Sequence, residues 1–148
     1  MTTAPRTSTL LRKICASKDM KGLLARHRSD FALPPFHVYL NRLCDARGLV
    51  PEQVILRAAI HRTYGHQLFN GIRKPSRDKA LQLALGLALG VEEAQTLLKM
   101  GRAAALYPRI ERDAAILYAL NKRLSVLETQ SLLGELGLTL LGGADKDA

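Results

Sequence analysis

Two segments of this chain, residues 77–98 and 112–133, repeat one sequence pattern at an offset of 35 residues. Compared position by position, the two segments are identical at 11 of 22 positions. The identical pairs are Arg77/Arg112, Asp78/Asp113, Ala80/Ala115, Ala84/Ala119, Leu85/Leu120, Leu89/Leu124, Val91/Val126, Glu93/Glu128, Gln95/Gln130, Leu97/Leu132 and Leu98/Leu133. Each copy has the apolar spacing of a helix, a short turn and a second helix. Because a repeat of this length is one supersecondary unit, the pattern predicts two helical hairpins that pack on each other.

Helix start signals mark the turn within each copy. Ser125 with Glu128 three residues later is a capping box, and Gly90 with Glu93 is a weaker version of it. No segment has the alternation or the β-branched richness of a strand. The chain is therefore predicted to be all-α, a compact bundle of about seven to nine short helices.

Residues 48–60 predict a short helix followed by a tight corner. Pro51 suits the first helical turn, where its missing N–H costs nothing. Val54, Ile55 and Ala58 then form an apolar stripe at helical spacing. Ala58 begins the corner, which the next two residues complete.

A second short helix is expected from about residue 62 to residue 70. Its inward-facing residues are Tyr64, Gly65, Leu68 and Phe69. Gly71 is placed to end the helix in the left-handed conformation, and Pro75 prevents a helix through Lys74. The outward face is polar and carries Arg62, Thr63, His66, Gln67 and Asn70. This is the layout of a helix-turn-helix, whose second helix enters the DNA major groove and reads base edges.

With these residues the chain resembles the lambda-repressor-like, or Cro-type, helix-turn-helix proteins of the XRE family. The matching residues are Gly48, Leu49, Val54, Ile60, Arg62, Tyr64, Leu68, Asn70, Gly71, Arg73, Lys74, Pro75 and Ser76. The resemblance covers roughly residues 35 to 99 and implies a lambda-repressor-like bundle. It implies that bases are contacted by Arg62, Thr63, His66 and Gln67. It implies that phosphates are contacted by Tyr64, Asn70, Arg73 and Lys74.

Three residues depart from the family pattern. Pro51 stands where the family often has a Gln that touches the DNA backbone, so this contact is expected to be lost. Ile55 stands where the family prefers Ala, and Gly65 stands where it prefers a bulky aliphatic residue. We expect the last two to compensate, with Gly65 making room for Ile55. Without that compensation the motif is distorted, and the glycine costs the helix about 1 kcal/mol against Ala in either case.

The chain is predicted to divide into three parts. Residues 1–34 hold a polar tail, expected to be disordered over residues 1–8, and then one or two short amphipathic helices, with Asp19 or Ser17 as a cap. Residues 35–100 form the helix-turn-helix DNA-binding domain. Residues 101–148 form a C-terminal helical hairpin, which is the second copy of the repeat, and a flexible polar tail.

Two interpretations of the C-terminal hairpin stay open. It provides a dimerisation or partner surface, or it only thickens the core. The first is favoured because four leucines lie close to the polar tail, where some are expected to be exposed. These are Leu136, Leu138, Leu140 and Leu141.

The positive charge of the chain is unevenly distributed. The net charge is +9, yet residues 1–90 hold 15 Lys/Arg against 5 Asp/Glu, and residues 91–148 hold 7 against 8. The basic excess therefore lies with the segment that resembles a DNA-binding domain, as expected where phosphates are neutralised. A basic N-terminal arm on the DNA backbone and a solvated helix face are both compatible with Lys18, Lys21, Arg26, His27 and Arg28.

Other classes of function find no support in the sequence. No metal-ligand spacing, phosphate-binding loop, nucleophile elbow or carboxylate pair with a nearby base is present, so the chain is interpreted as a non-enzyme without cofactor or metal. No apolar run approaches a membrane span, and the N-terminus lacks a secretory pattern. Cys15 and Cys44 are expected to be small apolar residues in a reducing cytoplasm. The expected location is cytoplasmic, and the nucleoid when DNA is bound.

The sequence therefore predicts a sequence-specific regulator of transcription that binds double-stranded DNA. It is expected to act as a homodimer and to read a symmetric site through the helix at residues 61–70. One alternative is a protein-interaction adaptor or antitoxin on the same fold. The other is a nonspecific nucleic-acid binder, which would show a steep salt dependence without sequence preference.

Overall fold

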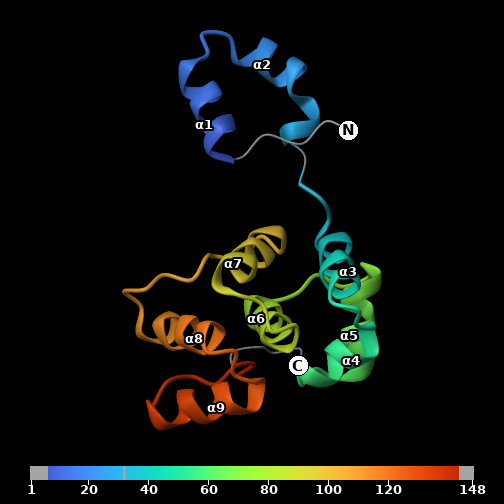
Figure 1. Ribbon diagram of the computed structural model, residues 1–148, viewed down its shortest axis with the longest axis vertical. Coiled ribbons are helices and arrows are strands. Elements are labelled where there is room, and N and C mark those ends of the chain that lie inside the picture. The colour runs from blue at the N-terminus through green and yellow to red at the C-terminus, as the bar shows by residue number, and fades with distance from the viewer. Residues whose placement is uncertain (1–6, 32, 144–148) are drawn as a thin grey trace. The chain divides into compact units, whose positions relative to one another are not determined.

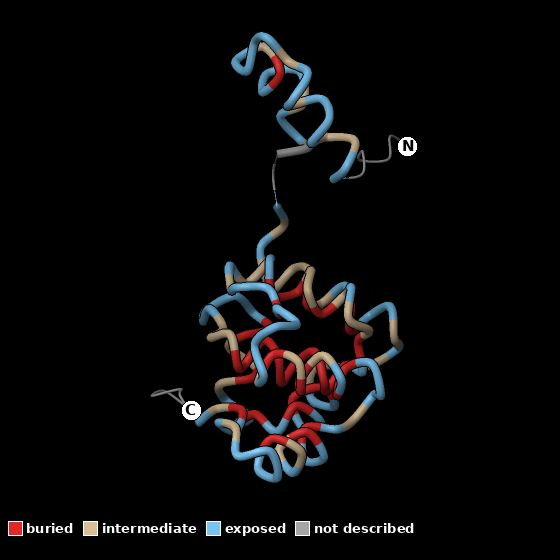
Figure 2. Tube along the Cα trace, turned by 90° about the vertical axis from the view of Figure 1, so that its left-hand side faces the viewer, coloured by how far each residue is buried: buried red, intermediate tan, exposed pale blue. Residues whose placement is uncertain are grey.

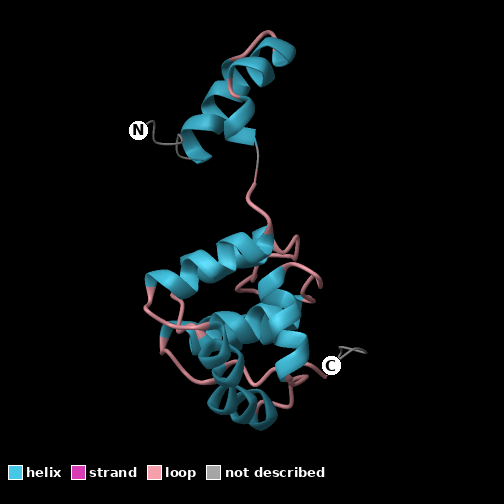
Figure 3. Cartoon of the chain, turned by 90° about the vertical axis from the view of Figure 1, so that its right-hand side faces the viewer, coloured by secondary structure: helices cyan, strands magenta, loops and turns pink. Residues whose placement is uncertain are grey.

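The computed structural model describes residues 7–31 and 33–143, and within them every regular element is helical (Figure 1, Figure 3). The prediction of an all-α chain is thus confirmed. Residues 1–6 of the segment expected to be disordered lie outside the described residues, and so do residues 144–148 of the flexible tail. The first helix includes Thr7 and Ser8, so the prediction of disorder is wrong for these two residues.

The chain divides into two compact units between Pro34 and Pro35. The first unit contains α1 (Thr7–Ala16), α2 (Met20–Arg26) and a short 3₁₀ helix (Arg28–Phe31). Asp19 holds the N-cap position of α2, but its side chain makes no capping hydrogen bond. The Ser17 Oγ instead accepts a hydrogen bond from the Asp19 N–H at 3.2 Å. Leu23 is buried within this unit, whereas α1 has no buried residue.

The second unit is a bundle of seven helices arranged around α6. In order these are α3 (Phe36–Ala46), α4 (Pro51–Arg57), α5 (Arg62–Asn70), α6 (Arg77–Gly86), α7 (Val91–Met100), α8 (Glu111–Asn121) and α9 (Val126–Glu135). Every residue of α6 after Arg77 is buried, because α4, α7 and α9 pack against different sides of it. A helix that is buried all round needs side chains that tolerate burial in every direction. Its alternating leucines and alanines supply them.

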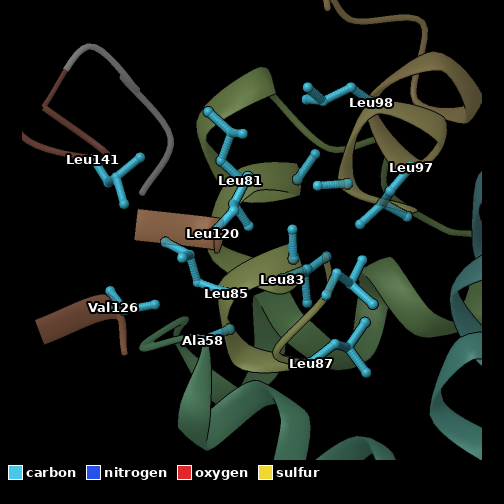
Figure 4. Packing of buried hydrophobic residues seen from close by; sticks show 14 of the residues in the cluster. Ala58, Leu81, Leu83, Leu85, Leu87, Leu97, Leu98, Leu120, Val126 and Leu141 are labelled. Carbon is cyan, nitrogen blue, oxygen red and sulfur yellow. The ribbon is translucent and has the colours of Figure 1, made fainter. Parts of the chain in front are cut away.

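The C-terminal hairpin shares one hydrophobic core with α3–α7. Figure 2 shows the buried residues gathered inside residues 35–143, and Figure 4 shows Leu81 and Leu85 of α6 facing Leu120 of α8. The sequence predicts a boundary near residue 100, but the structure has no break in the core there. The reason is that the second copy of the repeat covers apolar surface of the first.

Two reciprocal ion pairs join the copies of the repeat. The guanidinium of Arg77 donates to both carboxylate oxygens of Asp113 at 3.1 and 3.0 Å. The guanidinium of Arg112 donates to both oxygens of Asp78 at 3.0 and 2.9 Å. Each arginine therefore binds the aspartate that is equivalent to its own neighbour. Exchange of this kind is the signature of a two-fold, self-complementary interface, here formed within one chain.

The equivalence of the two copies continues beyond the second helix of each. The Gln95 side chain exchanges two hydrogen bonds with the backbone of Leu106, and Gln130 does the same with Leu141. Ala88 and Arg123, at equivalent turns, both have a left-handed φ, of 55° and 57°. The structural repeat is thus longer than the 22 residues that the sequence identities reveal. Ser125 and Glu128 form the predicted capping box at the start of α9.

Asp113, one of the two aspartates in the reciprocal ion pairs, predicts an acid-sensitive fold. Burial raises the pKa of Asp113. Hydrogen bonds from Arg77 and from the Tyr107 N–H together lower it by more than burial raises it, so the net pKa lies below its usual value. A carboxyl group with a depressed pKa in the folded state stabilises the protein above its unfolded pKa of about 3.9. That stabilisation is lost as the pH falls through the folded-state pKa.

We therefore expect the free energy of unfolding to decrease steeply below about pH 4, measured by urea unfolding across a pH series. Asp113→Asn should make that decrease shallower, whereas Glu135→Gln, at an exposed position of α9, should leave it unchanged. An identical pH profile for Asp113→Asn and the parent chain would contradict this assignment.

Candidate nucleic-acid interface

The corner between α4 and α5 has a fixed geometry. Ala59 has a left-handed φ of 56°, which turns the chain sharply after α4. The side-chain amide of Gln82 on α6 donates to the carbonyl oxygens of Ala58 and Ala59 at 3.0 and 3.4 Å. One turn further along α6, at its last residue, a Cβ on Gly86 would lie 2.8 Å from the Ala58 nitrogen. The corner is thus fixed by the buried side-chain amide of Gln82 and by the close approach of α6, which requires glycine at position 86.

Ile55 and Gly65 form a close contact between α4 and α5. A Cβ placed on Gly65 would lie 2.6 Å from both Cγ1 and Cγ2 of Ile55, far inside van der Waals contact. Both residues are buried. The expected compensation is confirmed, because the isoleucine side chain occupies the space that a side chain at position 65 would need. The helices therefore approach closely in spite of the large residue on α4.

The end of α5 is fixed by its own signals and by α3. Gly71 has a left-handed φ of 84°, as predicted. The Asn41 side chain on α3 donates to the Phe69 carbonyl oxygen at 2.8 Å. The Asn70 Oδ1 accepts a hydrogen bond from the Ile72 N–H at 3.0 Å. The side-chain oxygen of Asn70, one of the predicted phosphate contacts, thus stabilises the turn after α5.

The four residues predicted to contact bases lie together on the solvent side of α5, and we call them the open face of α5. Its members are Arg62, Thr63, His66 and Gln67. Arg62 and Thr63 are exposed, and His66 and Gln67 are half-buried. The opposite face of α5 is buried through Gly65, Leu68 and Phe69. The predicted inward face is confirmed for these three residues, whereas Tyr64, also predicted to face inward, is half-buried.

Glu52 of α4 occupies part of the open face and was not predicted to do so. One carboxylate oxygen accepts a hydrogen bond from Arg62 Nε at 2.5 Å, and the other lies 2.5 Å from His66 Nε2. These bonds, from Arg62 first and then from His66, lower the pKa of Glu52. In the sequence Glu52 had only the general preference of an acidic residue for a helix start. The ten-residue separation from Arg62 carries no local signal of the pairing.

The residues predicted to contact phosphates form a basic group at the end of α5. The Arg73 guanidinium lies 4.6 Å from the centre of the Tyr64 ring, and the Lys79 ammonium lies 5.6 Å from it. Arg73 Nε also donates to Gln67 Oε1 at 3.1 Å. Lys74 is exposed beside them. Tyr64 thus holds cationic side chains in place through its ring, and one of them is bonded to the open face.

The described ranges, residues 7–31 and 33–143, contain no group of three or more His, Cys, Asp or Glu side chains that is arranged to hold a metal ion. None of the helices in these ranges is both long and apolar enough to cross a membrane. Cys44 is buried, whereas Cys15 is exposed on α1, a helix that has no buried residue.

Comparisons of the chain with known proteins found no relative. No family model matches the chain, and neither the curated proteins nor the solved structures give a match. The proposed function therefore rests on the geometry of α4 and α5.

Proposed function

We propose that this protein is a sequence-specific regulator of transcription that binds double-stranded DNA through a lambda-repressor-like helix-turn-helix formed by α4 and α5. The observation that carries this proposal is the open face of α5. It presents four polar side chains on a helix whose other face, corner and end are all fixed by buried contacts. A rigid, exposed polar helix beside basic side chains fits the major groove of DNA.

The proposal gives each residue of the interface a task. Arg62, Thr63, His66 and Gln67 contact base edges. Tyr64, Asn70, Arg73 and Lys74 contact or position the phosphate backbone. Arg62 suits a guanine, and Gln67 suits an adenine, because these side chains match the donors and acceptors on those bases. Two copies of the chain would read a symmetric site, with half-sites about one helical turn apart.

Selection from a pool of random duplexes at two salt concentrations, followed by sequencing of the bound fraction, tests this function. We expect a palindromic motif to be enriched. Salt-sensitive binding without enrichment would support the nonspecific binder instead. Failure to bind at the lower salt concentration would refute DNA binding and favour the protein-interaction adaptor.

Single substitutions separate base reading from phosphate binding. Gln67→Ala is expected to cost about 1–3 kcal/mol of binding free energy and to relax specificity at one or two base pairs. Lys74→Ala is expected to weaken binding to all sequences alike and to lower the salt slope by about one. Titrations of the selected duplex and of single-base variants measure both. Equal weakening on every duplex by both substitutions would exclude base reading by α5.

Glu52 predicts a substitution that strengthens binding. Its carboxylate adds negative charge to the open face and holds Arg62 and His66 in the free protein. Glu52→Gln removes that charge, so we expect a several-fold tighter association with nonspecific duplexes at low salt. Glu135→Gln on α9 serves as the control of equal charge change. Weaker binding by Glu52→Gln would show instead that the carboxylate orients Arg62 and His66 for the DNA.

A further inference from the structure

The two copies of the repeat differ in one face. Positions at the contact between the copies are buried in both, as Leu81 and its equivalent Ile116 show. Other positions are buried in the first copy only. Leu83 is 0% exposed, whereas its equivalent Tyr118 is 55% exposed. The first copy is covered there by α3 and α4, and the two-fold relation puts the same face of the second copy on the surface.

The exposed face of the second copy forms an apolar groove with a volume of about 580 Å³ between α8 and the residues after α9. It is lined by Glu111, Ala114, Ala115 and Tyr118 of α8, by Leu132 of α9, and by Leu136 and Leu138 after α9. Leu136 is 56% exposed. We call this surface the α8–α9 groove. The internal repeat supplies a template for its occupant, because the equivalent surface of the first copy is filled.

In the first copy, α3 lies along α7 in the opposite direction. Phe36, at the start of α3, lies against Gly101 at the end of α7, where a Cβ on the glycine would be 3.4 Å from the Phe36 ring and 3.4 Å from Pro75. Arg47, just after α3, donates to Glu93 near the start of α7 at 2.7 Å. A helix seated in the same way thus needs an apolar face about three turns long and a cation after its last turn.

The second copy keeps one of these requirements and changes the other. Glu128 is the equivalent of Glu93, is exposed, and has a lowered pKa because it caps α9 through the Ser125 N–H, so it carries a negative charge. Leu136 replaces Gly101, so the second copy carries a leucine side chain at the position that faces Phe36 in the first copy. The occupant of the α8–α9 groove must therefore begin with a small side chain and end with a basic one.

Helix α1 of this chain has that pattern. In α3 the positions are Phe36, then Tyr39 and Leu40, then Leu43 and Cys44, and last Arg47. In α1 the same spacing gives Thr7, then Leu10 and Leu11, then Ile14 and Cys15, and last Lys18. The small Thr7 stands where α3 has Phe36. No residue of α1 is buried, and Leu11 is 58% exposed.

We propose that α1 of a second copy of this chain docks in the α8–α9 groove, with its apolar residues on Tyr118, Leu132 and Leu136 and with Lys18 beside Glu128. Each chain has one such helix and one such groove, so two chains exchange helices and close a two-fold dimer. This inference deepens the dimer of the proposed function. Its test uses no DNA, so failure of dimerisation and failure of DNA binding are distinguished.

Sedimentation of the full chain over a range of concentrations tests the exchange. The parent chain is expected to be a dimer. Leu11→Asp on α1 and Leu136→Asp in the groove replace exposed side chains and should each weaken dimerisation about tenfold or more. Leu127→Asp, at a position of α9 that is 77% exposed and outside the groove, is the matched control and should leave the dimer intact. Circular dichroism of each variant confirms that its helices remain.

Mixing the two weakened variants distinguishes exchange from other dimers. In the mixture, one chain supplies an intact α1 and the other an intact groove, so a heterodimer held by one contact should form. Lys18→Glu should weaken the parent dimer, and Glu128→Lys in the same chain should restore it. A parent chain that stays monomeric, a dimer that Leu11→Asp leaves unchanged, or a mixture without heterodimer would each overturn the proposal.

Discussion

Arg112→Ala is expected to lower the free energy of unfolding by about 3–5 kcal/mol, which for a chain of this length corresponds to a fall in melting temperature of roughly 6–20 °C. The substitution leaves Asp78 buried without the two hydrogen bonds from the guanidinium. It also removes the donors to the carbonyl oxygens of Thr139 and Leu140. A buried carboxylate that loses its partner retains the full cost of its desolvation.

Two comparisons show whether the geometry of this ion pair causes the loss. Arg109→Ala, at an exposed position just before α8, should change stability by less than about 0.5 kcal/mol. Arg112→Lys keeps the charge but not the two-pronged fork, so it should fall between the parent and the alanine variant. Because the copies are related by two-fold symmetry, Arg77→Ala should cost a similar amount. If Arg112→Ala and Arg77→Ala both gave melting curves that match the parent chain, a stabilising role for these ion pairs would be ruled out.

Ile55→Ala and Gly65→Leu are each expected to destabilise the protein, and the double variant is expected to recover much of the loss. Ile55→Ala empties the space between α4 and α5 and should cost about 2–5 kcal/mol. Gly65→Leu forces a side chain into the space that Ile55 occupies and should cost about 1–3 kcal/mol or more. In the double variant the leucine fills the space left by the isoleucine, and total core volume is kept.

Urea unfolding of the four proteins in this cycle measures the coupling between positions 55 and 65. We expect an interaction energy of about 1–3 kcal/mol in favour of the double variant. The pair Leu56→Ala and Gly65→Leu is a suitable control, because Leu56 is exposed on the far side of α4. Additive effects at positions 55 and 65 would mean that the two residues do not share one space. DNA binding by the recovered double variant would further test whether α5 keeps its position.

Local sequence signals predicted the elements of the candidate site closely. Pro51 begins α4, Gly71 ends α5, and Ser125 with Glu128 begins α9. Such signals act within one helical turn, through capping bonds, fixed φ angles or a missing donor, so they are readable without knowledge of the fold. The reciprocal preferences of Ile55 and Gly65 were also readable, because a change in one volume implies a change in the other.

Contacts between distant residues were not readable in the same way. The pairing of Glu52 with Arg62 and His66 depends on the angle between two helices, which the corner and α6 determine. The ion pair of Arg77 with Asp113 depends on how the two hairpins are turned toward each other. Identity between the copies showed that these residues recur. It did not show that each arginine binds the aspartate of the other copy.

The sequence by itself determined the all-α class, the limits of the helices around the corner, and the existence of two equivalent hairpins, because helix formation and termination depend on neighbouring residues. Only the tertiary structure decided which face of each hairpin is covered. Leu83 and Tyr118 hold equivalent positions, yet one is buried and the other is exposed. The physical reason is that α3–α5 precede the first copy and no equivalent three helices accompany the second among the described residues. One apolar face of the second copy is therefore left uncovered by the other helices of the second unit.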